Sequence, residues 1–94
     1  MDVGTAVGNA KVWLVNVLKD EGILNVGLEE VEFDEKQGLW LITLGFSRPW
    51  NSAARTAYAI ISGEQPDVSR SFRVIAVKDS NGEVVSMKRR EAVD

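Results

Sequence analysis

The first twenty residues carry apolar side chains at helical spacing. Between Thr5 and about Asp20 an apolar residue returns every three or four positions, and this spacing predicts an amphipathic helix. Thr5 can cap its first turn, and Gly22 can end its last. Additional valines and Leu14 widen the apolar stripe beyond the usual arc. We therefore expect a helix that is buried more widely than one sheet face could cover.

Two runs of alternating residues follow the helix. From Glu29 to Glu35, acidic residues alternate with Val31 and Phe33, which is the two-residue period of a half-buried strand. A turn at 36–38 leads into Leu39–Phe46, where both alternating sets are apolar. Apolar side chains on both faces are typical of a central strand, so the sequence predicts one here.

The C-terminal third predicts a β-hairpin. The segments 71–79 and 83–89 alternate like strands and flank Ser80-Asn81-Gly82. Asn-Gly between two alternating runs is the strongest short-range hairpin signal.

The segment 51–62 is ambiguous. Its alanines and the following Gly63 favour a short helix, whereas Thr56, Tyr58 and Ile60 alternate like a strand. We expect a helical or irregular crossover at about 50–65. The predicted fold class is α+β: a single domain over 1–94, with an N-terminal helix packed on a four-stranded antiparallel sheet, or a five-stranded one if this segment is a strand.

One helix can cover only one face of such a sheet. Phe72, Val74 and Ala76 alternate with Ile75 and Val77, so this strand also carries apolar side chains on both faces. The second face must then be covered by the segment 51–62, by a partner chain or by a ligand.

Composition excludes several chemistries. The chain of 94 residues has no Cys and no His, which removes thiolate nucleophiles, imidazole bases and His/Cys zinc sites. No Lys lies in an apolar stretch that could activate a serine, so we expect no enzyme and no cofactor. The net charge of -3 gives no electrostatic drive toward nucleic acid. No apolar run is long enough to cross a bilayer, and the chain has the features of a cytoplasmic protein.

The order of elements resembles small cystatin-like α+β domains, in particular PepSY-like modules. The hairpin Phe72–Met87, with its acidic turn and its Gly-Glu-Val sequence, carries this resemblance in residue detail. The resemblance implies a helix held against a curved sheet and a role in regulating or inhibiting partner proteins. The Gln-x-Val-x-Gly hairpin of cystatin protease inhibitors is missing, and the segment 49–69 is longer than the usual connection.

Charged residues gather in two places. Alternation puts Glu30, Glu32 and Asp34 in a row along one strand face, where they diverge toward solvent and do not enclose a metal ion. The tail Lys88–Arg90, with Arg70, Arg73 and Lys78 near it, can either form a phosphate-binding patch or pair with the acidic strand.

The residues that we expect to contact a partner or ligand are aromatic or basic. Arg48 and Trp50 lie beside Pro49 in a loop and are residue types favoured at interface hot spots. Trp40, Phe46 and Tyr58 would line an apolar pocket between the sheet and the segment 51–62 if the protein binds a small molecule or lipid. Our leading expectation is a non-catalytic regulatory module that forms a homodimer through its second sheet face or binds a protein partner.

Overall fold

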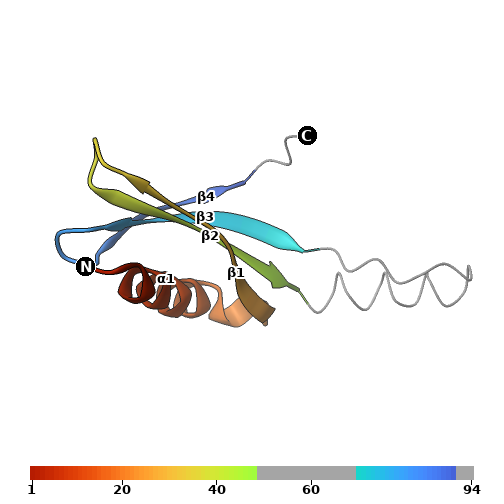
Figure 1. Cartoon of the computed structure of the whole chain (residues 1–94). Helices are drawn as coiled ribbons and strands as arrows, with labels where there is room; N and C mark the ends of the chain where they lie inside the picture. The colour runs from red at the N-terminus through yellow and green to blue at the C-terminus, as the bar shows by residue number, and fades with distance from the viewer. Residues whose placement is uncertain (49–69, 91–94) are drawn as a thin grey trace, which may run out of the picture.

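One helix packs on one face of a four-stranded antiparallel sheet in the computed structural model, which describes residues 1–48 and 70–90 (Figure 1). Helix α1 spans Val3–Val17, and a short 3-10 turn, η1, spans Lys19–Glu21. The strands are β1 (Leu24–Asp34), β2 (Leu39–Ser47), β3 (Ser71–Lys78) and β4 (Val84–Arg89), in the spatial order β1-β2-β3-β4. The predicted α+β class is therefore confirmed. The segment 51–62 lies outside the described residues.

The helix begins and ends earlier than the sequence pattern predicted. Asp2 is the N-cap in place of Thr5, because its Oδ1 accepts a hydrogen bond of 2.7 Å from the Thr5 backbone N–H. That hydrogen bond also lowers the pKa of the Asp2 carboxyl. Gly22 adopts a left-handed conformation, with φ of 62°, and ends η1 rather than α1.

The expectation of a widely buried helix was wrong. Only Ala6, Ala10 and Leu14 are fully buried on α1, at a spacing of four residues that keeps them on one narrow stripe. Val12 is 64% exposed and Val15 is 46% exposed. The two alanines bring the helix axis close to the sheet, so the contact is tight but narrow.

The strand register assigns each side chain to a face. Ile42 lies opposite Val31 on β1 and Ile75 on β3, and these residues belong to the core beneath α1. Leu41 lies opposite Glu32 and Ala76, on the face that points away from α1. Because paired residues in antiparallel strands share a face, the predicted two-sided apolar pattern of β2 and β3 is confirmed.

Strand β1 starts five residues earlier than predicted and is irregular. Its register with β2 shifts twice, between Leu24 and Gly27 and again between Leu28 and Glu30. These irregularities break the alternation that would have revealed the strand in the sequence.

The irregular part of β1 contains a cross-strand glycine pair. Gly27 lies opposite Gly45 of β2, and the Arg70 side chain lies over both, with its Nη2 donating to the Asn25 carbonyl oxygen at 2.9 Å. A Cβ atom added at Gly45 would lie 3.0 Å from the Phe72 ring, from Arg70 Nη2 and from Glu29 Oε1. The glycine therefore leaves the space that these side chains occupy.

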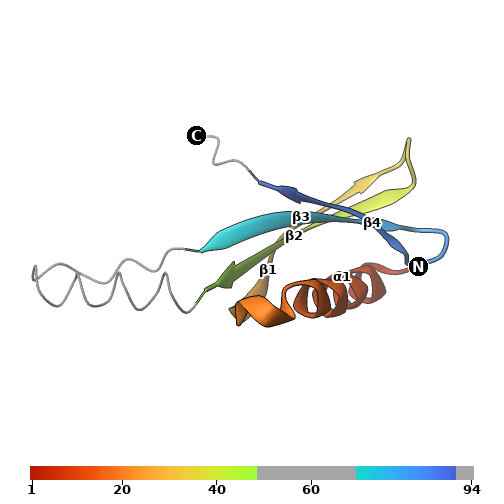
Figure 2. The same ribbon diagram turned by 180° about the vertical axis from the view of Figure 1, so that it is seen from behind.

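The sheet is strongly twisted, as expected for antiparallel strands. The β1–β2 turn and the end of β4 rise away from α1, whereas the β3–β4 turn comes down beside the start of the helix (Figure 1). There the Asn9 Nδ2 donates a hydrogen bond of 3.2 Å to the Gly82 carbonyl oxygen. The opposite view shows α1 along β2 and β3 again, with no described element on the other face of the sheet (Figure 2).

We predict that Gly45→Ala lowers the free energy of unfolding by about 1–3 kcal/mol, because the added methyl group must displace three close neighbours. Gly8→Ala is the matched control: it adds the same methyl group in the interior of α1, where no atom lies within 4 Å of the new Cβ. This control should raise stability by about 0.5–1 kcal/mol. Urea unfolding monitored by circular dichroism measures both, and equal effects would contradict the crowding argument.

Candidate functional site

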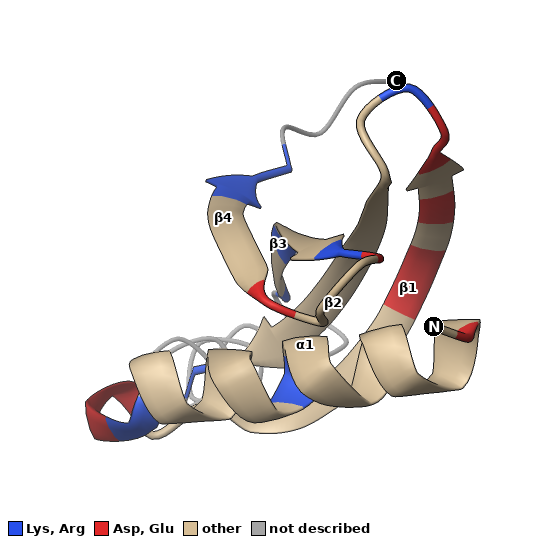
Figure 3. Ribbon diagram, turned by 90° about the vertical axis from the view of Figure 1, so that its left-hand side faces the viewer, with Lys and Arg blue, Asp and Glu red and all other residues tan. Residues whose placement is uncertain are grey.

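The sheet face that points away from α1, here called the outer face, is divided by charge. Its residues are Glu30, Glu32 and Asp34 on β1; Leu39, Leu41 and Thr43 on β2; Phe72, Val74, Ala76 and Lys78 on β3; and Ser86 and Lys88 on β4. The two edge strands carry opposite signs, with acidic residues along β1 and basic residues at the end of β4 (Figure 3). Between these edges, the outer-face side chains of β2 and β3 are apolar apart from Thr43 and from Lys78 at the end of β3.

The apolar centre of the outer face is half-buried. Leu39, Leu41, Phe72 and Val74 keep intermediate exposure, and Ala76 is 4% exposed. Among the described residues, no helix or strand packs on this face. Within this described part of the chain, the neighbouring side chains therefore reduce the contact of this face with water.

Part of that cover comes from ion pairs across the face. The Arg90 Nη1 lies 4.0 Å from Glu30 Oε2, and its guanidinium carbon lies 5.8 Å from the centre of the Phe72 ring. Arg70 Nη2 lies 3.8 Å from Glu29 Oε1. Two basic residues thus pair with the acidic strand, which was one of the two arrangements that the sequence left open. Exposed pairs at these distances are worth at most about 1 kcal/mol each.

Trp40 lies on the helix side of β2, where it is a structural residue. Its ring packs against Phe33 with the ring centres 4.7 Å apart, and its Nε1 donates a hydrogen bond of 2.9 Å to Asp79 Oδ1. The same oxygen lies 3.1 Å from the Met1 ammonium group. The hydrogen bond from Trp40, followed by that from Met1, lowers the pKa of the Asp79 carboxyl. The bond from Trp40 joins the β3–β4 turn to β2, and the bond from Met1 joins the same turn to the residues before α1.

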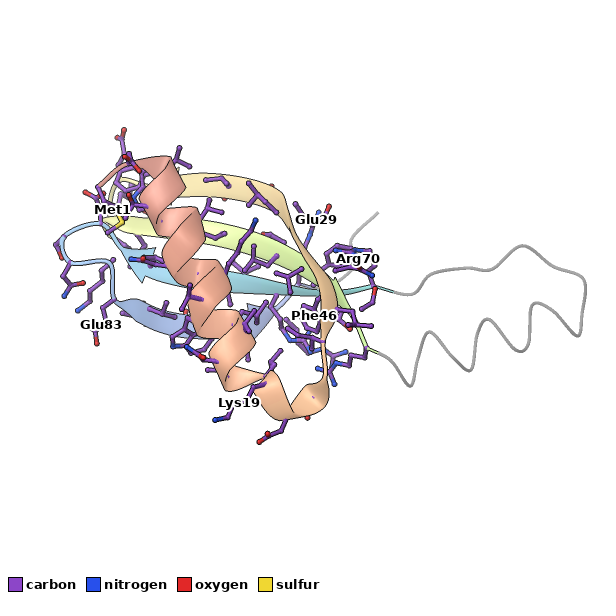
Figure 4. The ribbon with its side chains drawn as sticks, turned by 90° about the horizontal axis from the view of Figure 1, so that it is seen from below. Met1, Lys19, Glu29, Phe46, Arg70 and Glu83 are labelled. Atoms are coloured by element: carbon purple, nitrogen blue, oxygen red, sulfur yellow. The ribbon has the colours of Figure 1, made fainter. Side chains whose placement is uncertain are left out.

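Phe46 lies in the core near the end of α1 at which the chain continues to Lys19 (Figure 4). Its side chain is 0% exposed. The guanidinium carbons of Arg48 and Arg73 lie 5.6 Å and 5.7 Å from the centre of its ring, within the range of cation–π attraction. Arg48 Nη1 also donates a hydrogen bond of 2.9 Å to Glu21 Oε1. Of the predicted contact residues, the structure thus brings Phe46 and Arg48 together, and Trp50 and Tyr58 lie outside the described residues.

Arg73 and Arg89, two of the basic residues grouped together in the sequence analysis, form a like-charge pair. They lie directly opposite each other in the β3–β4 register. Burial, followed by the positive charges of Arg48 and Arg89, lowers the pKa of the Arg73 guanidinium. Alternation in the sequence separates Arg89 from Lys88 and Arg90, but only the register of β4 shows that Arg89 shares the face of Arg73.

An open groove of about 320 Å³ lies between α1 and the β3–β4 turn, on the other side of the helix from β1. It is lined by Asn9, Val12, Trp13, Asn16, Gly82 and Val84. None of these is a predicted pocket residue. The pocket predicted between the sheet and the segment 51–62 involves residues that the structure does not describe, and it stays a prediction.

Comparisons with models of protein families, with curated proteins and with solved structures give no match. Within residues 1–48 and 70–90, no helix is both long and apolar enough to span a membrane. In the same residues, no three acidic side chains come together as ligands for a metal ion.

We predict that protonation of Asp79 lowers the stability of the folded state at acidic pH. The pKa of Asp79 is lower in the folded state than the value near 3.8 that holds in the unfolded chain. The ionised carboxylate therefore contributes to the free energy of unfolding above that value, and this contribution is lost as the pH falls through the folded-state pKa. Asp79→Asn should therefore flatten the fall in melting temperature below about pH 4.

Trp40→Phe is the matched variant, because it keeps an aromatic ring against Phe33 and removes the N–H donor to Asp79. Adding Asp79→Asn to this variant should change the acid dependence less than in the wild-type background. Thermal melts by circular dichroism between pH 2.5 and pH 6 would show both effects. Parallel curves for wild type and Asp79→Asn would contradict the assignment.

Proposed function

We propose that the protein is a non-catalytic interaction module that forms a symmetric homodimer through its outer face. The observation that carries this proposal is the layout of that face, in which an apolar centre lies between one acidic edge and one basic edge. A surface with this layout is complementary to a copy of itself. Covering the half-buried apolar centre would add hydrophobic stabilisation in proportion to the apolar area removed from water.

The charges also select how the two copies would meet. In a two-fold dimer the same patch faces itself. If the two-fold axis runs along the strands, the acidic β1 edge of each copy faces the basic β4 edge of the other. If the axis runs across the strands, acid faces acid and base faces base. Like charges across an interface disfavour association, so the first arrangement is the proposed one.

A regulatory role accords with the cystatin-like arrangement of one helix on a four-stranded antiparallel sheet. The resemblance of the hairpin Phe72–Met87 to PepSY-like modules supports the same class of function. A homodimer would then present two identical copies of the remaining surface to a protein partner.

Leu41→Lys is expected to convert the dimer into a monomer, because Leu41 lies on a central strand and two added charges would be buried near the two-fold axis. Val15→Lys is the matched control, since it introduces the same charge on α1, where Val15 is already 46% exposed. Light scattering coupled to size-exclusion chromatography measures the mass of each variant. A monomeric wild type, or dissociation by Val15→Lys alone, would overturn the proposal.

A charge swap tests the direction of the axis. Glu32 and Lys88 lie on opposite edges of the outer face, and neither makes an ion pair within the described residues. Glu32→Lys alone and Lys88→Glu alone should each weaken the dimer, because residues 32 and 88 of the two copies then carry charges of the same sign at both edges.

An equimolar mixture of the two variants should dimerise again, because each chain then meets its complement at both edges. The measurement is analytical ultracentrifugation of each variant and of the mixture at low salt, where exposed charges are screened least. If the mixture dimerised no better than its components, the axis along the strands would be wrong.

A further inference from the structure

The described chain contains a cluster of arginines at one end of the sheet, on the helix side. Arg73 lies opposite Leu44 of β2, a core residue beneath α1, and opposite Arg89 of β4. The guanidinium groups of Arg48 and Arg73 both lie over the Phe46 ring. The ring is fully buried, so it gives both groups a fixed support.

This arrangement is electrostatically unfavourable in the protein alone. Like charges that lie directly opposite each other on neighbouring strands destabilise a sheet. Within the described residues, neither Arg73 nor Arg89 has a carboxylate oxygen within 4.0 Å. In the described part of the chain, the Arg73 side chain donates one hydrogen bond, from Nη1 to the Phe72 carbonyl oxygen at 2.8 Å.

The neighbouring basic residues show a different pattern. Arg90 and Arg70 each have an acidic partner on β1, and Lys78 has Glu83 at 3.9 Å. The chain is acidic in total, so carboxylates are plentiful. Within residues 1–48 and 70–90, the positive charge of Arg73 and Arg89 is therefore concentrated at one place, and no carboxylate pairs with it.

We propose that Arg73 and Arg89 bind a phosphate group, with the charge of Arg48 adding to the attraction. A phosphate monoester carries a charge of about −1.5 to −2 at pH 7 and three strong acceptor oxygens. Guanidinium groups recognise such oxygens in pairs through parallel N–H donors. Glu21 occupies one donor of Arg48, so Arg73 and Arg89 supply the main contacts. The shared chemistry is the phosphate dianion, whether free or on a small ester.

This site is separate from the proposed dimer surface. Arg73 and Arg89 share the face of Leu44, whereas Lys88 and Val74 share the outer face. Phosphate binding is therefore expected in a monomer as well as in a dimer, and the two proposals can fail independently.

The test compares Arg89→Gln with Lys88→Gln in thermal melts with and without phosphate. Arg89 is exposed and supports no core residue, so its variant should fold. Lys88→Gln removes the same charge one residue away, on the other face. Inorganic phosphate and glycerol 2-phosphate are the probes, and sodium chloride at equal ionic strength is the reference.

Both probes should raise the melting temperature of wild type and of Lys88→Gln above the chloride reference, because a ligand that binds only the folded state stabilises it. Arg89→Gln should lose this rise, and without phosphate it should melt at the wild-type temperature or above, since the repulsion from Arg73 is gone. Titration calorimetry should show binding weakened about tenfold or more in Arg89→Gln.

Three results would overturn the proposal. One is a wild type that responds to phosphate no more than to chloride. Another is an equal loss in Lys88→Gln and Arg89→Gln, which would indicate general charge screening. The last is a fall in the melting temperature of Arg89→Gln without phosphate, which would show that Arg89 stabilises the fold directly.

Discussion

The alternation of β2 is the constraint on which the rest of the structure depends. A strand cannot bury Ile42, Leu44 and Phe46 beneath α1 without sending Leu39 and Leu41 to the other face. Because the chain has apolar residues in both sets and α1 covers one face, the outer face is left with an apolar centre. The narrow Ala6–Leu14 stripe of α1 packs mainly against β2 and β3, and the helix also reaches β4.

The fold could be predicted from the sequence wherever alternation is unbroken. In β2 and β3 the two-residue alternation of the sequence predicts both the strands and the face on which each side chain lies. The Asn81-Gly82 turn joins β3 to β4 as expected. The start of β1 was missed because two register shifts and the Gly27–Gly45 pair interrupt its period. The N-cap was misplaced because Asp2 and Thr5 are both capping residues, and the hydrogen bond between them decides which one caps.

The candidate site was predictable only in part. Alternation along the strand puts Trp40, Phe46 and Arg48 on the same side. It does not reveal that Trp40 donates a hydrogen bond to Asp79 or that two guanidinium groups lie over the Phe46 ring. These contacts join residues from different strands and depend on side-chain conformations. The same holds for the basic tail, whose members look equivalent in the sequence and separate only when the register of β4 is known.

That register depends on one irregularity close to the β3–β4 turn. Val77 lies opposite Val84, but Ala76 lies opposite Ser86, so Val85 is an extra residue in β4. Without this shift Arg73 would lie opposite Lys88, and Phe72 would lie opposite Arg89. Arg89 would then turn to the outer face, and Lys88 would turn to the helix side, because a slip of one residue reverses every side chain. A single bulge thus decides which basic residue of β4 lies on which face: it places Lys88 on the outer face and Arg89 beside Arg73 on the helix side.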